Sequence, residues 1–319
     1  MRFFAYFVLS GKKNIYQAYK GLSEEEYIKL GFDNKPTYEL MREFIYERIS
    51  VEQFPLIMCW IVQEIKDLLM EKKSISLGKR TYEDATDTHS LKHDPEAKYS
   101  GYYKHCGYKI DKTIDADIDL PLYYIPMEII TDEGKSLIPS QEHLKFLGIH
   151  EEERTVDIKY ATFENIVHSE INSISLYYKI AKNWVFSKKG EEKEIKKRYQ
   201  KYHQEHDFIV NPTLDFILRY LYKKGDIENV GAYYRNQRMK QAENDPERYK
   251  KICDKRGVHM EGHIGRVKLT TLLDDHPGRR GWKQFLLRSG MTMLSLVFAA
   301  LIRVQNDVFE HLSNVTYIV

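Results

Sequence analysis

A carboxylate and an ammonium stand seven residues apart in the stretch 260–268, which reads Met-Glu-Gly-His-Ile-Gly-Arg-Val-Lys. Glu261, Gly265 and Lys268 occupy positions i, i+4 and i+7, so a helix would place them on one face. A neighbouring stripe with the same spacing is apolar: Met260, Ile264 and Val267. Such a helix could pack on a sheet and offer a ligand for a divalent cation beside a phosphate-binding group. A solvated helix face is the competing interpretation.

The elements before this helix have the pattern of a mixed sheet. Periodicity predicts strands over 79–86, 108–114, 122–130, 154–158 and 174–181, and helices over 141–147 and 162–171. This order of three strands, helix, strand, helix and strand is that of the RNase H-like fold. It places Asp84 on the first strand and Asp157 at the end of the fourth. We therefore expect an α/β protein with an RNase H-like mixed sheet flanked by helices.

Two regions surround this sheet in the predicted organisation. Residues 1–76 carry apolar stripes at helical spacing, which suit a DNA-binding segment or a bundle that only packs. Residues 77–319 form the expected catalytic domain, with a helical, basic insertion at about 183–255. Within it, residues 188–201 hold seven basic and three acidic residues, a net charge of +4. Tyrosines interleave with this charge, which favours a phosphate-tracking surface or a solvated helix face equally.

Composition is that of a soluble protein in a reducing compartment. The 319 residues are 42% hydrophobic and 30% charged, and the formal net charge is only +2, so any DNA affinity must come from local basic faces. Three cysteines cannot form a disulfide framework, which fits the cytoplasm. The apolar run 291–302 is shorter than the roughly 18 residues that a membrane span needs, and it predicts a buried core helix.

Three ordered blocks between Gly78 and Asn306 resemble those of prokaryotic DDE-type insertion-sequence transposases. The first is Asp84-Ala-Thr-Asp, with His93-Asp-Pro-Glu-Ala and Gly107-Tyr-Lys behind it. The second is Asp157-Ile-Lys-Tyr160, and the third runs from Arg256 through Glu261 to Lys268 and the Gly-Arg-Arg-Gly of 278–281. In that family three residues usually separate the Arg from the Glu. Here four do, which leaves the role of Arg256 open.

The resemblance implies that Asp84, Asp157 and Glu261 hold two Mg²⁺ or Mn²⁺ ions, with Asp84 bridging them. Two such ions can stabilise both the attacking and the leaving oxygen of a phosphodiester. Water would first release a 3′-OH at the end of the element, and that hydroxyl would then attack target DNA. The implied partners are terminal inverted repeats, target DNA and a second copy of the chain on DNA, with no membrane. Candidate DNA contacts are Lys109, Tyr160, Arg256, Arg266 and Lys268.

Several alternatives compete with this interpretation. Asp87 is also acidic, but its odd offset from Asp84 turns it to the other face of a strand. Tyr160 could pack instead of touching DNA, and Lys109 could be a plain solvent contact. Zinc is disfavoured because Cys253, His259 and His263 lack a fourth ligand and a standard spacing. At the level of function, the rivals are a DNA-binding relic, truncated or inactive, and an RNase H-fold nuclease without strand transfer.

Overall fold

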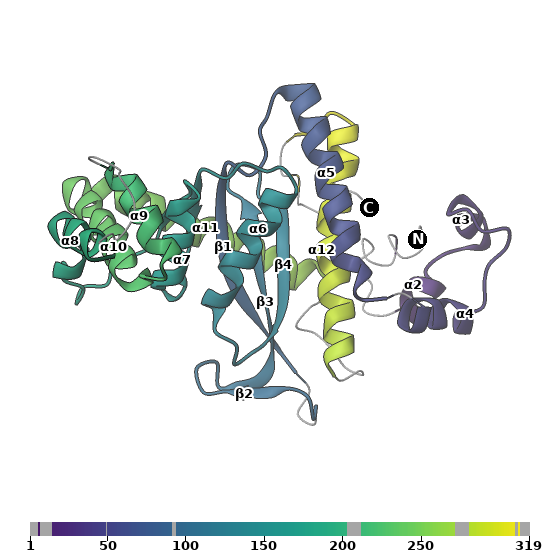
Figure 1. The fold of residues 1–319 in the computed structure, drawn as a ribbon. Helices are drawn as coiled ribbons and strands as arrows, with labels where there is room; N and C mark the ends of the chain where they lie inside the picture. The colour runs from purple at the N-terminus through teal and green to yellow at the C-terminus, as the bar shows by residue number, and fades with distance from the viewer. Residues whose placement is uncertain are drawn as a thin grey trace.

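A curled mixed β-sheet lies at the centre of the protein, with helices on both sides (Figure 1). The structure is a computed structural model that describes residue 6 and residues 15–48, 50–90, 94–202, 212–271, 281–309 and 312. One group of helices extends from one side of the sheet, and a pair of long helices covers the other side (Figure 1). The chain is therefore a mixed α/β protein, as its periodicity predicts.

The sheet has an antiparallel part and a parallel part that meet at strand β1. The strands are β1 (Arg80–His89), β2 (Lys98–Ser100), β3 (His105–Asp115), β4 (Pro121–Glu128), β5 (Glu153–Thr155) and β6 (Ser175–Tyr177). β3 pairs antiparallel with β1 on one edge and with β2 and β4 on the other. β5 runs parallel to β1, and β6 runs parallel to β5. Apart from β2, which pairs with β3 beside β4, the strands thus lie in the order β4, β3, β1, β5, β6.

The five predicted strands and two predicted helices between 79 and 181 are confirmed, with shifted ends. The helices are α6 (Leu137–Phe146) and α7 (Phe163–Ile171). α7 begins where expected because the Thr162 side chain accepts a hydrogen bond from the Asn165 backbone N–H, a normal N-cap. β5 and β6 are only three residues long each, and β2 has no counterpart among the predicted strands.

Two long helices, α5 (Gln53–Lys73) and α12 (Trp282–Gln305), lie side by side against the sheet (Figure 1). They approach closely at Gly290, where a Cβ atom would lie 2.3 Å from Cδ2 of the Phe54 ring. Their buried side chains belong to the same hydrophobic cluster as Tyr108 and Ile110 of β3. A domain boundary at residues 76 and 77 would divide this core, so α5 belongs structurally with the sheet.

α12 is longer than the apolar run in the sequence suggests. By length and composition it could cross a membrane, but 72% of its most apolar 18-residue window is buried inside the protein. It contacts α5 and β4, and Met293, Leu294, Val297 and Ala300 are fully buried. The expectation of a buried core helix is confirmed.

Helices also fill the predicted insertion and the N-terminal region. The insertion contains η4 (Lys188–Gly190), α8 (Glu192–Tyr202), α9 (Leu214–Lys223), α10 (Ile227–Asn244) and the start of α11 (Pro246–Thr271). α11 is continuous through residue 255, so the predicted end of the insertion falls inside a helix. The N-terminal region contains α2 (Ile15–Lys20), α3 (Glu24–Lys29), α4 (Tyr38–Glu43) and η1 (Phe44–Arg48). The insertion and the N-terminal helices lie at opposite ends of the molecule (Figure 1).

The basic run of the insertion lies largely on α8, where two of its lysines are paired locally. Lys196 Nζ lies 2.5 Å from Glu192 Oε1, and Lys197 Nζ lies 3.9 Å from Glu194 Oε2. All four side chains are exposed to solvent. Such i,i+3 and i,i+4 pairs are typical of a solvated helix face.

Candidate functional site

Asp84 on β1 and Asp157, which follows the neighbouring strand β5, lie at equivalent positions along the two parallel strands. β1 and β5 are parallel, and Tyr82 is paired with Thr155. Two residues further along each chain segment are Asp84, still within β1, and Asp157, just beyond β5. Because side chains alternate along a strand, residues two positions on return to the same face. The register therefore brings these two carboxylates to one side of the sheet.

Asp157 is fixed in place by the turn that follows β5. Its side chain caps the short 3₁₀ helix η3 (Ile158–Tyr160) and accepts a hydrogen bond of 3.1 Å from the Lys159 backbone N–H. Asp residues favour such positions because a carboxylate can satisfy a backbone donor that has no partner in the helix. Its second carboxylate oxygen, Oδ2, is directed toward α11.

Arg256 of α11 joins the two aspartates. Its Nη1 donates a hydrogen bond of 2.5 Å to Asp84 Oδ2, and its Nη2 lies 3.5 Å from Asp157 Oδ2. The Arg256 side chain is 13% exposed, and that of Asp84 is 24% exposed. One turn later, Met260 is fully buried against Tyr82, which fixes this face of α11 on the sheet.

The electrostatics of the pair favour a cation. Burial raises the pKa of Asp84 above its ordinary value, the Arg256 guanidinium opposes this rise, and the charges of Asp157 and Glu133 add to it. Arg256 therefore offsets part of the cost of holding Asp84 ionised beside Asp157. Carboxylate oxygens are the ligands that Mg²⁺ and Mn²⁺ prefer, and the two Oδ2 atoms already converge on one positive group.

Glu261 does not join this pair in the structure. Its side chain is exposed, whereas the Asp84 side chain is only 24% exposed and is paired with Arg256. Glu261 lies five positions after Arg256 on the α-helix, which turns it by about 140° around the helix axis. The face of α11 that carries Met260 and Arg256 meets the sheet, and Glu261 points away from that face.

Lys268 lies near the end of α11 and contacts a different aspartate. Its Nζ is 3.8 Å from Asp87 Oδ1 on β1. The shared face predicted for Glu261 and Lys268 agrees with their helical positions, since both lie on α11. The contact with Asp87 shows that Lys268 reaches the end of β1.

Three other candidate DNA contacts have different surroundings. Lys109 is 3% exposed, and its Nζ lies 3.2 Å from Glu133 Oε1, so it is neither a solvent contact nor a surface phosphate ligand. Tyr160 is fully buried and donates its hydroxyl hydrogen to Asp111 Oδ2, which corresponds to the packing alternative. Both side chains lack the exposed surface that a DNA backbone would touch. The side chain of Arg266 lies outside the described residues, as do His93 and residues 278–280.

A network of buried polar side chains lies beneath this site, and the sequence analysis did not predict it. Ser136 donates to Asp111 Oδ2 at 2.7 Å, and Arg154 Nη1 donates to Glu83 Oε2 at 2.5 Å. Burial raises the pKa of Glu83 despite Arg154, and burial followed by the Glu83 charge raises that of Asp111. Tyr160 also belongs to this network. The available signal was the presence of charged residues within predicted strands, such as Glu83 on β1 and Asp111 on β3, and such residues more commonly lie on a solvated strand face.

The zinc alternative at the third block is not supported by the positions of its residues. Cys253 is buried against Tyr249 and Tyr177, while His259 Nδ1 lies 2.9 Å from Asp119 Oδ1. In the part of the chain that the structure describes, the group of side chains with metal-ligand spacing is instead Asp87, His89 and His105.

Comparison with known proteins adds no family to this geometry. No family model matches the chain, and no curated protein matches it. The functional assignment therefore depends on the arrangement of Asp84, Asp157 and the residues of α11.

Proposed function

We propose that the protein is a DDE-type transposase that cleaves DNA at the ends of an insertion sequence and joins them to target DNA. In this proposal the sheet is RNase H-like. The strand order β4, β3, β1, β5, β6 supports it, with three antiparallel strands followed by two that run parallel to the first. The placement of α6 and α7 before and after β5 agrees with the same fold.

The observation that carries the proposal is the convergence of Asp84 and Asp157 on one cationic group. Their Oδ2 atoms lie 2.5 and 3.5 Å from the two terminal nitrogens of Arg256. A pair of carboxylates, one on a strand and one in the turn that follows the adjacent parallel strand, is a suitable ligand set for hard divalent cations. Bound there, Mg²⁺ or Mn²⁺ would activate the attacking oxygen and stabilise the leaving oxygen of a phosphodiester.

The residues of α11 have distinct roles in this proposal. Arg256 neutralises the aspartates until a divalent cation takes their oxygens, and its guanidinium is then available to a DNA phosphate. Glu261 is the third acidic ligand, and it reaches the aspartates only if α11 turns or shifts. Lys268 supplies a positive charge for the DNA backbone at the far end of the helix.

DNA is the proposed substrate. Its two paired ends are the reason for proposing a homodimer, and its place in the cell is the reason for proposing a nucleoid-associated enzyme. Joining of paired ends requires two active sites, which a homodimer on DNA would supply. A cytoplasmic, nucleoid-associated enzyme without a membrane anchor fits the burial of α12 in the core. Two rival functions remain as outcomes of the experiment: a nuclease without strand transfer, and a relic that only binds DNA.

The decisive experiment incubates the full-length protein with Mg²⁺ and labelled DNA that carries the inverted repeats flanking its gene. Cleavage followed by joining supports the transposase, cleavage alone indicates the nuclease, and binding alone indicates the relic. Asp84→Asn and Asp157→Asn should each abolish cleavage while DNA binding persists. Asp254→Asn is the matched control, because it is the same change at an aspartate of α11 whose side chain is 45% exposed and paired to Lys179 instead of Arg256. Cleavage retained in both active-site variants would overturn the assignment.

A further inference from the structure

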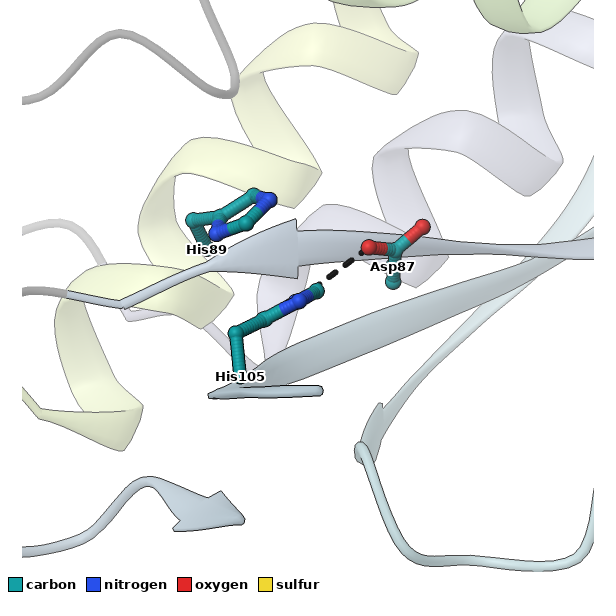
Figure 2. A group of neighbouring side chains, drawn as sticks. All are labelled: Asp87, His89 and His105. Atoms are coloured by element: carbon teal, nitrogen blue, oxygen red, sulfur yellow. Dashed lines mark ion pairs between the residues drawn. The ribbon is translucent and has the colours of Figure 1, made fainter. Parts of the chain in front are cut away.

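Three potential metal ligands gather where β1 ends and β3 begins. Figure 2 shows Asp87 and His89 on β1 beside His105 on β3. Asp87 and His89 are two residues apart and share one face of the strand. His89 is paired with Gly107, and His105 lies two residues before Gly107, which places it on the same face. Asp87 is three residues from Asp84, so this group lies on the opposite face of β1 from the proposed catalytic pair.

The ligand atoms are close enough to bind one ion. Nε2 of His105 lies 3.2 Å from Oδ2 of Asp87 (Figure 2), and one ligand atom from each of the three residues lies within 4.8 Å of the others. Two ligands of a tetrahedral zinc ion, each bonded at roughly 2.1 Å, are about 3.4 Å apart. The Asp87–His105 separation matches this spacing, and the exposed His89 belongs to the same group within 4.8 Å.

Hydrogen bonding prepares His105 as a ligand. Its Nδ1 lies 3.1 Å from the backbone carbonyl oxygen of Tyr103, an acceptor, so Nδ1 carries a hydrogen and donates it. The other ring nitrogen, Nε2, faces the Asp87 carboxylate. A backbone carbonyl on the second ring nitrogen is the usual way in which a protein orients a metal-binding histidine.

The two histidines also contact each other, and Asp87 contacts Lys268 as well. The His89 and His105 rings are stacked, with centroids 3.6 Å apart and planes inclined by 19°. On the other side, Lys268 Nζ lies 3.8 Å from Asp87 Oδ1, which leaves Oδ2 facing His105.

We propose that Asp87, His89 and His105 form a binding site for one divalent transition-metal ion of the zinc class. Imidazole nitrogens select zinc over Mg²⁺, which prefers oxygen ligands, so this site differs in metal preference from the Asp84–Asp157 pair. Three protein ligands leave a fourth tetrahedral position for water or an exogenous ligand. Because the ligands come from β1 and β3, the ion would also tie together the ends of these two strands.

Metal binding to the full-length protein tests the proposal without DNA or Mg²⁺. The apoprotein is titrated with Zn²⁺ against a chromophoric chelator, and Co²⁺ is added in parallel to record its visible ligand-field bands. We expect one ion per chain and the intense bands of tetrahedral Co²⁺. His105→Ala and His89→Ala should each weaken Zn²⁺ binding by at least about 100-fold, because loss of a group that only orients a ligand already costs 10–100-fold. His150→Ala, at an exposed histidine outside the group, should bind normally.

A second variant separates metal binding from a simple ion pair. Lys268→Met removes a positive charge 3.8 Å from Asp87 and should tighten Zn²⁺ binding several-fold, because the ammonium repels the ion.

His89 is exposed, so His89→Ala should fold normally, and circular dichroism confirms this for each variant. The proposal is overturned if Zn²⁺ binding is not saturable at one site, or if His89→Ala and His105→Ala bind as tightly as the wild type. These outcomes do not depend on whether the protein cleaves DNA.

Discussion

Arg256 and Asp84 are 172 residues apart in the chain, and they share a hydrogen bond of 2.5 Å between α11 and β1. The same guanidinium reaches Asp157 at 3.5 Å, so one cation serves two carboxylates. A protein that binds a divalent cation at these oxygens must move Arg256 aside. Under the proposed function, metal ions and Arg256 would therefore compete for the same place, and this competition can be measured.

Replacement of Arg256 by Met should destabilise the protein without Mg²⁺ and strengthen its response to Mg²⁺. Without the guanidinium, the Asp84 carboxylate remains largely buried but loses its cationic partner. This loss should lower the unfolding free energy by about 1–3 kcal/mol. Added Mg²⁺ should then raise the melting temperature of Arg256→Met more than that of the wild type. Arg248→Met, an exposed position on α11, is the control for thermal unfolding with and without Mg²⁺. Equal Mg²⁺ responses in all three proteins would contradict the competition.

Glu261→Gln separates stability from activity. Because Glu261 is exposed, its replacement should change the unfolding free energy by less than about 0.5 kcal/mol. If it is the third metal ligand, the same change should abolish Mg²⁺-dependent DNA cleavage. Glu247→Gln, also exposed on α11, should leave both properties unchanged. Wild-type cleavage by Glu261→Gln would show that the exposed position seen here is also its position during catalysis.

Asp111 should make stability depend on pH in a defined direction. Burial, and then the charge of Glu83, raise the pKa of Asp111 well above the ordinary 3.8. The folded protein binds this proton more tightly than the unfolded chain does. The stabilising contribution is therefore fully present below the unfolded pKa and is lost as pH rises through the folded pKa.

Asp111→Asn removes this titration and keeps an oxygen that can accept from Tyr160 and Ser136. Relative to the wild type, the unfolding free energy of the variant should increase as pH rises above about 4. Urea denaturation at a series of pH values measures the difference, with Asp254→Asn as an exposed control. Parallel pH profiles for wild type and Asp111→Asn would mean that Asp111 is not proton-linked.

Two matched glycine substitutions test the packing of α5 on α12. A Cβ at Gly290 would lie 2.3 Å from the ring of the buried Phe54, so Gly290→Ala should cost about 1–3 kcal/mol. Gly257 on α11 has no atom within 4 Å of such a Cβ. Gly257→Ala should therefore stabilise the helix by up to about 1 kcal/mol. Chemical denaturation compares the two, and a neutral Gly290→Ala would argue against the close approach of α5 and α12.

Local sequence was sufficient to find five of the six strands of the sheet, among them β1, which carries Asp84, and β5, which ends two residues before Asp157. The period of two along β1, β3 and β4 and the Thr162 cap of α7 are local signals, because backbone geometry and capping depend on neighbouring residues. The helix around Glu261 was found in the same way, from its spacing. None of these signals depends on which distant segments pack together.

Tertiary packing alone determined which side of α11 meets the sheet and which polar side chains are buried. Met260 packs on Tyr82, and because successive helix residues differ by about 100°, that contact turns Glu261 outward and brings Arg256 to Asp84. Lys109 and Tyr160 are buried because Glu133 and Asp111 satisfy them. A polar side chain gives no local sign of such a partner, since whether it is exposed or buried depends on groups that only the folded chain brings near it.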